Sequence, residues 1–258
     1  MRLMKRILSA AAVLALSASL LVGCSSGTAS SVPVSASSAA ESTVSSVEET
    51  ASSAVDENEA AAAQLLNDLT GSYQELWPVI LADEYKQTWL DDCTALVGEE
   101  NAEAAFEKLS SMVTSDVYGE DAVEAYANGG GAYFCGFTNS LATLTFDGET
   151  STISGTDKDG NVLFSHTYHY IGMEPVHGLY EFESDDADSG EFTYFFLAPD
   201  TSAETYHIEF RYGSDAETLS QYDAGEYAYW VASGISTDCG QTMIDNCIEL
   251  FCTENLAG

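Results

Sequence analysis

The second half of the chain alternates apolar and polar residues with a period of two, and turn residues interrupt the pattern at short intervals. Such alternation predicts β-strands, because successive side chains of a strand point to opposite faces of a sheet. Dipeptides such as Asp147-Gly148 and Asp159-Gly160 between the runs are typical of hairpin turns. The predicted strands span residues 132–137, 141–146, 150–154, 161–171, 177–182, 192–198 and 205–212.

Seven consecutive strands joined by short turns predict a meandering antiparallel sheet. An open sheet would expose edges that invite pairing with other chains, so we expect closure into an up-and-down barrel. Apolar residues at helical spacing predict helices ahead of the strands and behind them. The predicted fold class is therefore mainly β, an antiparallel up-and-down barrel with N-terminal helices and a C-terminal helix. The predicted helices span residues 59–69, 85–97, 102–112, 217–222 and 239–252.

The first 24 residues have the order of an export signal. Three basic residues precede an apolar run over residues 7–21, which ends in Leu21-Val22-Gly23-Cys24. The run is shorter than the ~20 residues that a membrane span needs. A cysteine after a small residue resembles the bacterial lipobox, in which that cysteine is lipidated. We predict a lipoprotein signal peptide over 1–23, a lipid anchor on Cys24 and an extracytoplasmic location on a bacterial surface or in a periplasm. An ordinary secretory signal with an incidental cysteine is the alternative.

Composition divides the remaining chain into a tether and a domain. Residues 25–58 contain no aromatic residue, leucine or isoleucine, so they cannot bury a core and are predicted to be disordered. Residues 59–258 suffice for one domain. The whole chain has 42 acidic and only seven basic residues, a formal net charge of −35. Nucleic acid would repel such a surface, which excludes that partner, and cations would be attracted weakly. Solubility is the simpler explanation for most of these charges.

Cysteines and catalytic motifs give little direct indication of chemistry. Five cysteines follow Cys24, an odd number, and none has the CxxC spacing of a thiolate zinc site. Cys247 falls on the apolar face of the last predicted helix, so a buried thiol is expected there. Residues 59–258 contain no HExxH or GxSxG motif. We therefore do not expect an enzyme.

The strand over residues 205–212 carries the best candidate for a binding site. Alternation places His207, Glu209 and Arg211 on one face, opposite an apolar face. An imidazole and a carboxylate two residues apart lie side by side, and both can reach one zinc ion at ~2.0–2.2 Å. Spacing alone favours the alternative, a solvated polar face. His169, on the polar side of its strand, is a candidate third ligand.

Several motifs of the chain resemble the ZinT (YodA) family of zinc-binding proteins with a lipocalin-like, or calycin-like, barrel. A related domain forms the C-terminal half of AdcA-type zinc lipoproteins. The resemblance covers most of the predicted domain. The motifs that carry it are Leu69-Thr70-Gly71-Ser72-Tyr73-Gln74-Glu75-Leu76-Trp77-Pro78, Tyr168-His169-Tyr170-Ile171-Gly172, Gly178-Leu179-Tyr180-Glu181-Phe182-Glu183 and Tyr206-His207-Ile208.

The resemblance implies a zinc site whose ligands are only partly retained. The family uses one histidine of an "S-D-H" motif and both histidines of "H-F-H". Here the "S-D-H" position falls near Phe195, and His207 alone remains of the pair. If His207 takes the first place, Glu209 takes the second. If it takes the second place, Thr205 takes the first.

These observations lead to one hypothesis and its alternatives. The chain is expected to capture zinc or a similar divalent ion outside the cytoplasm through His207, Glu209 and His169, and to pass it to a metal ABC transporter. One alternative is a barrel that has lost the metal site and binds a small organic ligand between its aromatic strands. Another is a module that binds a protein partner.

Overall fold

The computed structural model describes residues 57–257. The predicted signal peptide, Cys24 and nearly all of the predicted tether lie outside the described residues. The first described element is a helix over residues 57–68, which agrees with the prediction for 59–69. Within the described part of the chain, no helix has the length and apolar character needed to cross a membrane.

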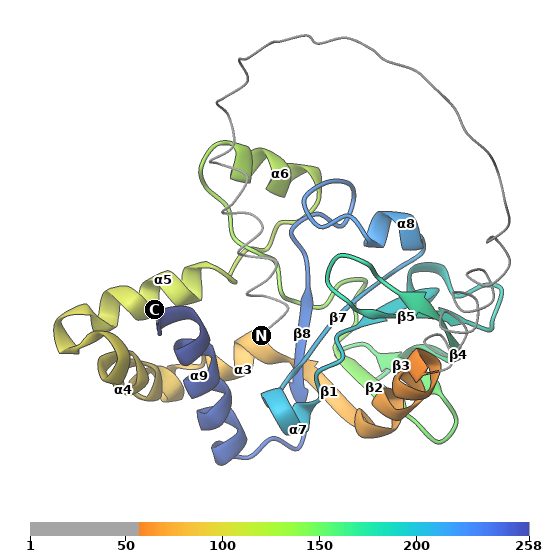
Figure 1. The fold of residues 1–258 in the computed structure, drawn as a ribbon, viewed down its shortest axis with the longest axis horizontal. Helices are drawn as coiled ribbons and strands as arrows, with labels where there is room; N and C mark the ends of the chain where they lie inside the picture. Colours follow the sequence, from red (N-terminus) through yellow and green to blue (C-terminus); the bar gives the residue numbers. More distant parts are fainter. Residues whose placement is uncertain (1–56, 258) are drawn as a thin grey trace, which may run out of the picture.

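Eight antiparallel strands form a closed barrel in which each strand pairs with its neighbours in chain order (Figure 1). The barrel closes where the first strand pairs with the last, and Tyr73 lies opposite both Leu144 and Ser236. This closure confirms the predicted barrel. The strands are β1 Gly71–Glu75, β2 Thr143–Asp147, β3 Thr152–Thr156, β4 Val162–Met173, β5 Tyr180–Ser184, β6 Tyr194–Leu197, β7 Ile208–Gly213 and β8 Ala232–Ser236.

Three features of the barrel differ from the prediction. The two strands that close it, β1 and β8, were not predicted from their sequences. Residues 132–137, predicted to be a strand, form only isolated bridges, in which Phe134 pairs with Thr114 and Trp230. This segment runs beside β8, where the Ser233 amide donates to the carbonyl of Cys135. The strand prediction for 132–137 was therefore wrong.

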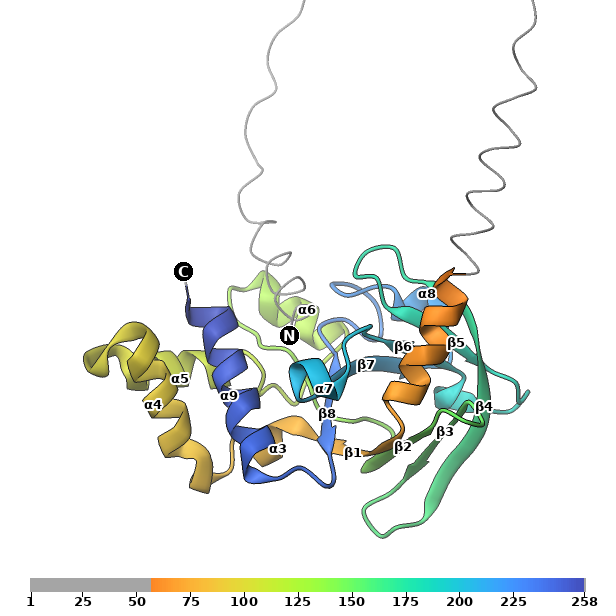
Figure 2. The same cartoon turned by 60° about the horizontal axis from the view of Figure 1, so that its bottom comes forward.

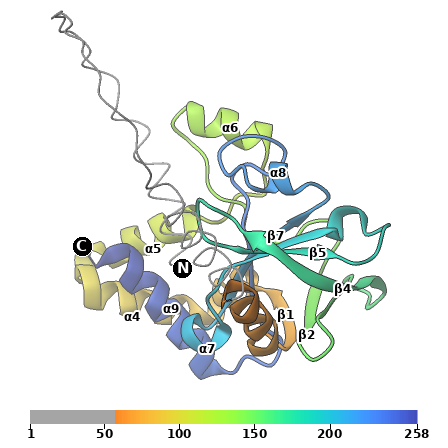
Figure 3. The same ribbon diagram turned by 45° about the vertical axis from the view of Figure 1, so that its right-hand side comes forward.

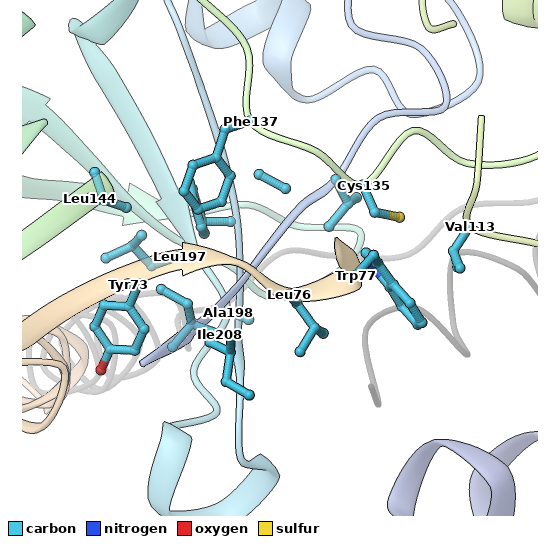
Figure 4. Close-up of a cluster of buried hydrophobic side chains, with 14 of the residues drawn as sticks. Tyr73, Leu76, Trp77, Val113, Cys135, Phe137, Leu144, Leu197, Ala198 and Ile208 are labelled. Carbon is cyan, nitrogen blue, oxygen red and sulfur yellow. The ribbon is translucent and has the colours of Figure 1, made fainter. Parts of the chain in front are cut away.

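Large apolar side chains fill the interior of the barrel. Directly paired residues of antiparallel strands share a face. The pairs Phe195–Tyr212 and Leu197–Phe210 therefore point the same way, into the lumen. Phe195 and Tyr212 pack with ring centroids 5.4 Å apart. Figure 4 shows Tyr73, Leu144, Leu197 and Ile208 gathered in the same cluster.

A group of helices packs beside the barrel (Figures 1 and 2). It consists of α3 Leu76–Ile80, α4 Lys86–Val97, α5 Ala102–Ser111 and α9 Gln241–Leu256. Three aromatic side chains join these helices, because Phe251 of α9 lies 4.9 Å from Trp77 of α3 and 5.8 Å from Trp89 of α4 between ring centroids. The C-terminal helix thus contacts the N-terminal helices.

Shorter elements cover the remaining surfaces. The helix over residues 57–68 packs against the barrel with the buried side chains of Ala62, Leu65 and Leu66 (Figure 3). The other elements are α6 Glu120–Ala127, α7 Ser202–Thr205, α8 Ala216–Leu219 and the 3-10 turns η1 Asp83–Tyr85, η2 Glu99–Asn101 and η3 Gly190–Phe192.

Candidate functional site

The β7 strand is buried on both of its faces. The lumen takes Ile208, Phe210 and Tyr212, as the pairing register shows. On the outer face, His207, Glu209 and Arg211 are exposed by only 1%, 4% and 0%. The alternative of a solvated polar face is therefore wrong. Cys247 of α9 meets His207, Cys135 lies near Glu209, and α8 with the loop after it covers Arg211.

A tight turn positions His207 at the start of β7. Tyr206 ends α7 in the left-handed conformation, with φ of 66°, and so turns the chain from the helix into the strand. The Thr205 hydroxyl then donates to the carbonyl of His207 at 2.8 Å. These two features fix the backbone from which the imidazole projects.

The two nitrogens of the His207 ring face different partners. Nδ1 donates to the carbonyl oxygen of Thr205 at 2.6 Å and lies 3.9 Å from the Sγ atom of Cys247 on α9. Nε2 lies 3.8 Å from Oε1 of Glu209. Because a carbonyl can only accept, the Nδ1 position carries a proton. The hydrogen bond with Thr205 therefore sets the tautomer and directs Nε2 toward the carboxylate.

The surroundings of His207 favour its charged form. Burial by itself lowers the pKa of an imidazole. Here the interactions of His207 with Cys247 and Glu209 outweigh burial and raise the pKa above its usual range. His207 and Glu209 therefore form an ion pair inside the protein when no other cation takes the place of the proton.

Two further polar side chains lie beside Glu209. Ser233 of β8 pairs directly with Glu209 in the sheet register, so both project outward. Cys135 comes from the segment that runs along β8, and burial together with the nearby Glu209 raises the pKa of its thiol. The row of polar groups thus extends from Cys247 through His207 and Glu209 to Cys135.

Arg211 has a structural role at the far end of the same face. Its guanidinium donates to the backbone carbonyls of Leu219, Gln221 and Tyr227, and it stacks over the ring of Tyr222 with Cζ 4.2 Å from the centroid. These carbonyls belong to α8 and the loop after it. Arg211 therefore holds that loop against the barrel.

The structure does not bring His169 to His207 and Glu209. It lies on β4 with about half of its side chain exposed, and its ring contacts Asp185 at 2.8 Å and Glu183 at 4.0 Å. Another histidine, His177, is buried 3.5 Å from Glu174, well separated in sequence from the β7 site. Within residues 57–257, no group of three or more histidine, cysteine, aspartate or glutamate side chains is arranged to hold a metal ion.

No pattern in the sequence indicates that Cys247 meets His207. Helical spacing predicted a buried thiol, and Cys247 is indeed fully buried. Its contact with His207 joins residues 40 positions apart. No local pattern encodes such a contact, because it depends on how α9 docks on the barrel wall.

Two cavities on the surface are lined by described residues. One of about 530 Å³ lies between the helix over residues 57–68 and α7, and is lined by Gln64, Tyr180 and Glu204 among others. The other, of about 300 Å³, lies between α3 and residues 113–115. Both lie outside the barrel lumen, which aromatic side chains fill.

Known proteins resemble this one in structure. No family model matches the sequence, and no curated protein matches it. The solved structure of the Zn(II)-bound ZinT-like domain of Streptococcus pneumoniae AdcA is similar, with a TM-score of 0.45 and 15% identity over 71% of this chain and 89% of that domain. Zn(II)-bound AdcA of the same organism has a TM-score of 0.42 and 14% identity over 72% of this chain and 35% of its own. This chain therefore spans about a third of AdcA.

Proposed function

We propose that this protein binds zinc or a similar divalent cation at the outer face of β7, with His207 and Glu209 as ligands. The observation that carries the proposal is the pair itself. An imidazole nitrogen and a carboxylate oxygen lie 3.8 Å apart in a buried site, and a backbone carbonyl holds the other ring nitrogen. A metal-bound histidine commonly donates its second N–H in this way, which fixes the tautomer.

The chemistry of the pair fits zinc. Two ligands at ~2.0–2.1 Å from a tetrahedral ion are about 3.4 Å apart, close to the observed separation of Nε2 and Oε1. Imidazole and carboxylate are both common zinc ligands. The pair occupies two of four tetrahedral positions, so we expect weaker and less selective binding than three histidines provide.

The wider function follows from the predicted export signal. A lipid on Cys24 would tether the acidic domain near a membrane, where it can collect cations and pass them to a metal transporter. The formal charge of −35 raises the local cation concentration but selects none. Selection is therefore assigned to His207 and Glu209.

The test is calorimetric titration of the purified, chelator-treated protein with Zn²⁺. We expect one saturable site per chain, stronger than the diffuse binding of the acidic surface. His207→Ala and Glu209→Gln should each weaken it about 100-fold or more, since even outer partners of metal ligands are commonly worth 10–100-fold. The control is His177→Gln, which alters another buried histidine next to a carboxylate.

The control separates a metal site from general effects of a buried substitution. If His177→Gln weakens binding as strongly as His207→Ala, the loss comes from disturbed folding. If the wild type shows only weak, multiple binding that no variant changes, the acidic surface is responsible and the proposal fails. Circular dichroism of each variant checks that the barrel is intact.

A further inference from the structure

Two buried cysteines from opposite ends of the domain meet between α4 and α9. Cys93 lies on α4 and Cys252 on α9, and neither has exposed surface. Their Sγ atoms are 3.9 Å apart, although 159 positions separate the residues in the chain. This is a contact distance for two sulfur atoms, so no other group stands between them.

The interface around the two sulfurs is well defined. The ring of Phe251, adjacent to Cys252, packs against Trp89 of α4 with centroids 5.8 Å apart. Both helices are therefore held in register by aromatic contacts next to the thiols. A disulfide needs an S–S distance near 2.05 Å, so its formation requires the two side chains to move together from this contact distance.

We propose that Cys93 and Cys252 form a disulfide bond that fixes the C-terminal helix to α4. The bond belongs to the protein in an oxidising compartment, such as the one that the export signal before Cys24 predicts. The proposal is independent of metal binding, since Cys252 lies on a different part of α9 from Cys247.

The bond forms by exchange with an oxidised disulfide, such as oxidised glutathione. One cysteine loses its proton and attacks a sulfur of the oxidant, which releases one thiol and leaves a mixed disulfide. The second cysteine loses its proton and attacks the protein sulfur of that mixed disulfide, releasing a second thiol. In total two protein thiols are oxidised and one oxidant disulfide is reduced to two thiols.

The folded structure constrains when this reaction takes place. Burial raises the pKa of both Cys93 and Cys252, which suppresses the reactive thiolate. Attack by an external oxidant is therefore slow once α9 has docked. The bond forms during folding, and the same burial then protects it from reductants.

The test refolds the purified full-length chain in a glutathione redox buffer. The product is unfolded without reductant, alkylated and mapped by mass spectrometry. We expect two of the six thiols to resist alkylation and the linked peptides to contain Cys93 and Cys252. Because the bond closes a long loop, protein refolded in excess reductant should melt on the order of 10 °C below protein refolded in the redox buffer.

Variants identify the pair independently of stability. Cys93→Ala and Cys252→Ala should each abolish the cross-link and the sensitivity of the melting temperature to reductant. Cys239→Ala, the matched control, should retain both. The proposal is overturned if all six thiols of the wild type are alkylated, or if the linked peptides contain any other pair. It is also overturned if either alanine variant keeps the reductant-sensitive shift. Mapping of the wild type decides the matter even if both variants fail to fold.

Discussion

The two faces of β7 are equally buried but stabilised in different ways. The inner face places Phe210 and Tyr212 among other aromatic rings of the lumen. The outer face places His207, Glu209 and Arg211 under a second layer of helices and loops. Burial of apolar surface stabilises the inner face directly. The outer face is stabilised by polar contacts, because His207 pairs with Glu209 and Arg211 donates to carbonyls of α8 and the loop after it.

Phe210→Ala tests the inner face and should have the largest effect. Removing a fully buried aromatic ring from the lumen costs both burial and packing, about 3–5 kcal/mol of unfolding free energy. Urea unfolding measures the loss. Val162→Ala, which truncates an exposed side chain of β4, is the control and should change stability by less than about 0.5 kcal/mol. A loss below about 2 kcal/mol for Phe210→Ala would mean that the lumen is loosely packed.

Arg211→Met tests the structural end of the outer face. The substitution keeps most of the volume but removes the donors to the carbonyls of Leu219 and Tyr227. We expect a loss of about 2–4 kcal/mol, because buried acceptors are left without donors. Arg211→Lys keeps the charge but not the planar fork, so it should recover less than half of the loss in the same unfolding assay. Full recovery by lysine would show that charge alone matters.

A double-mutant cycle tests the His207–Glu209 pair in the presence of a chelator. Each single leucine substitution removes one member of a buried ion pair and should cost about 2 kcal/mol or more. The double variant should cost less than the sum by about 1–3 kcal/mol, because it removes both charges together. Additive losses would contradict a direct interaction between the two side chains.

Acid titration of Glu174 should give the smallest effect. Burial raises the pKa of this carboxyl, but hydrogen bonds from His177 and Val176 outweigh it and lower the pKa below 4.5. A lowered folded pKa stabilises the protein above pH 4.5, and this stabilisation is lost as the pH falls through the folded value. Each unit by which folding lowers the pKa of a carboxyl adds about 1.4 kcal/mol to the free energy of unfolding at neutral pH.

Comparison of variants isolates this carboxyl. Melting temperatures measured down the acid limb should fall less steeply for Glu174→Gln than for the wild type. Glu149→Gln, in the exposed turn after β2, should follow the wild-type curve. Equal slopes for all three proteins would show that Glu174 is not responsible.

Sequence reasoning predicted the elements whose pattern is local. The strands β2 to β7 and the helices α4, α5 and α9 have clear periodicity, and the structure confirms them. The strands that close the barrel have none, since β1 buries only Tyr73 and β8 is made of small residues such as Ala232 and Gly234. Their pairing is dictated by the barrel rather than by their own composition.

Only the part of the site formed by residues that are close in the sequence could be predicted. Alternation correctly placed His207 and Glu209 side by side, as their interaction at 3.8 Å shows. It could not show whether that face is exposed to solvent or buried, because the segments that cover it, around Cys135 and Cys247, are distant in the sequence. The period of the apolar and polar residues identifies which side chains share a face. The docking of distant elements decides whether that face is buried and which chemistry is possible there.

The pairing of β1 with β8 also governs the order in which the protein can fold. The barrel cannot close until Tyr73 of β1 pairs with Ser236 of β8. Nearly the whole domain must therefore be present before closure. Such distant contacts make folding slow compared with that of helical proteins. A chain that emerges from its amino end therefore remains open, with unpaired strand edges, until the last strand arrives. The rate of this closing step, rather than the stability of any single hairpin, determines how long the chain stays exposed to proteases and to aggregation.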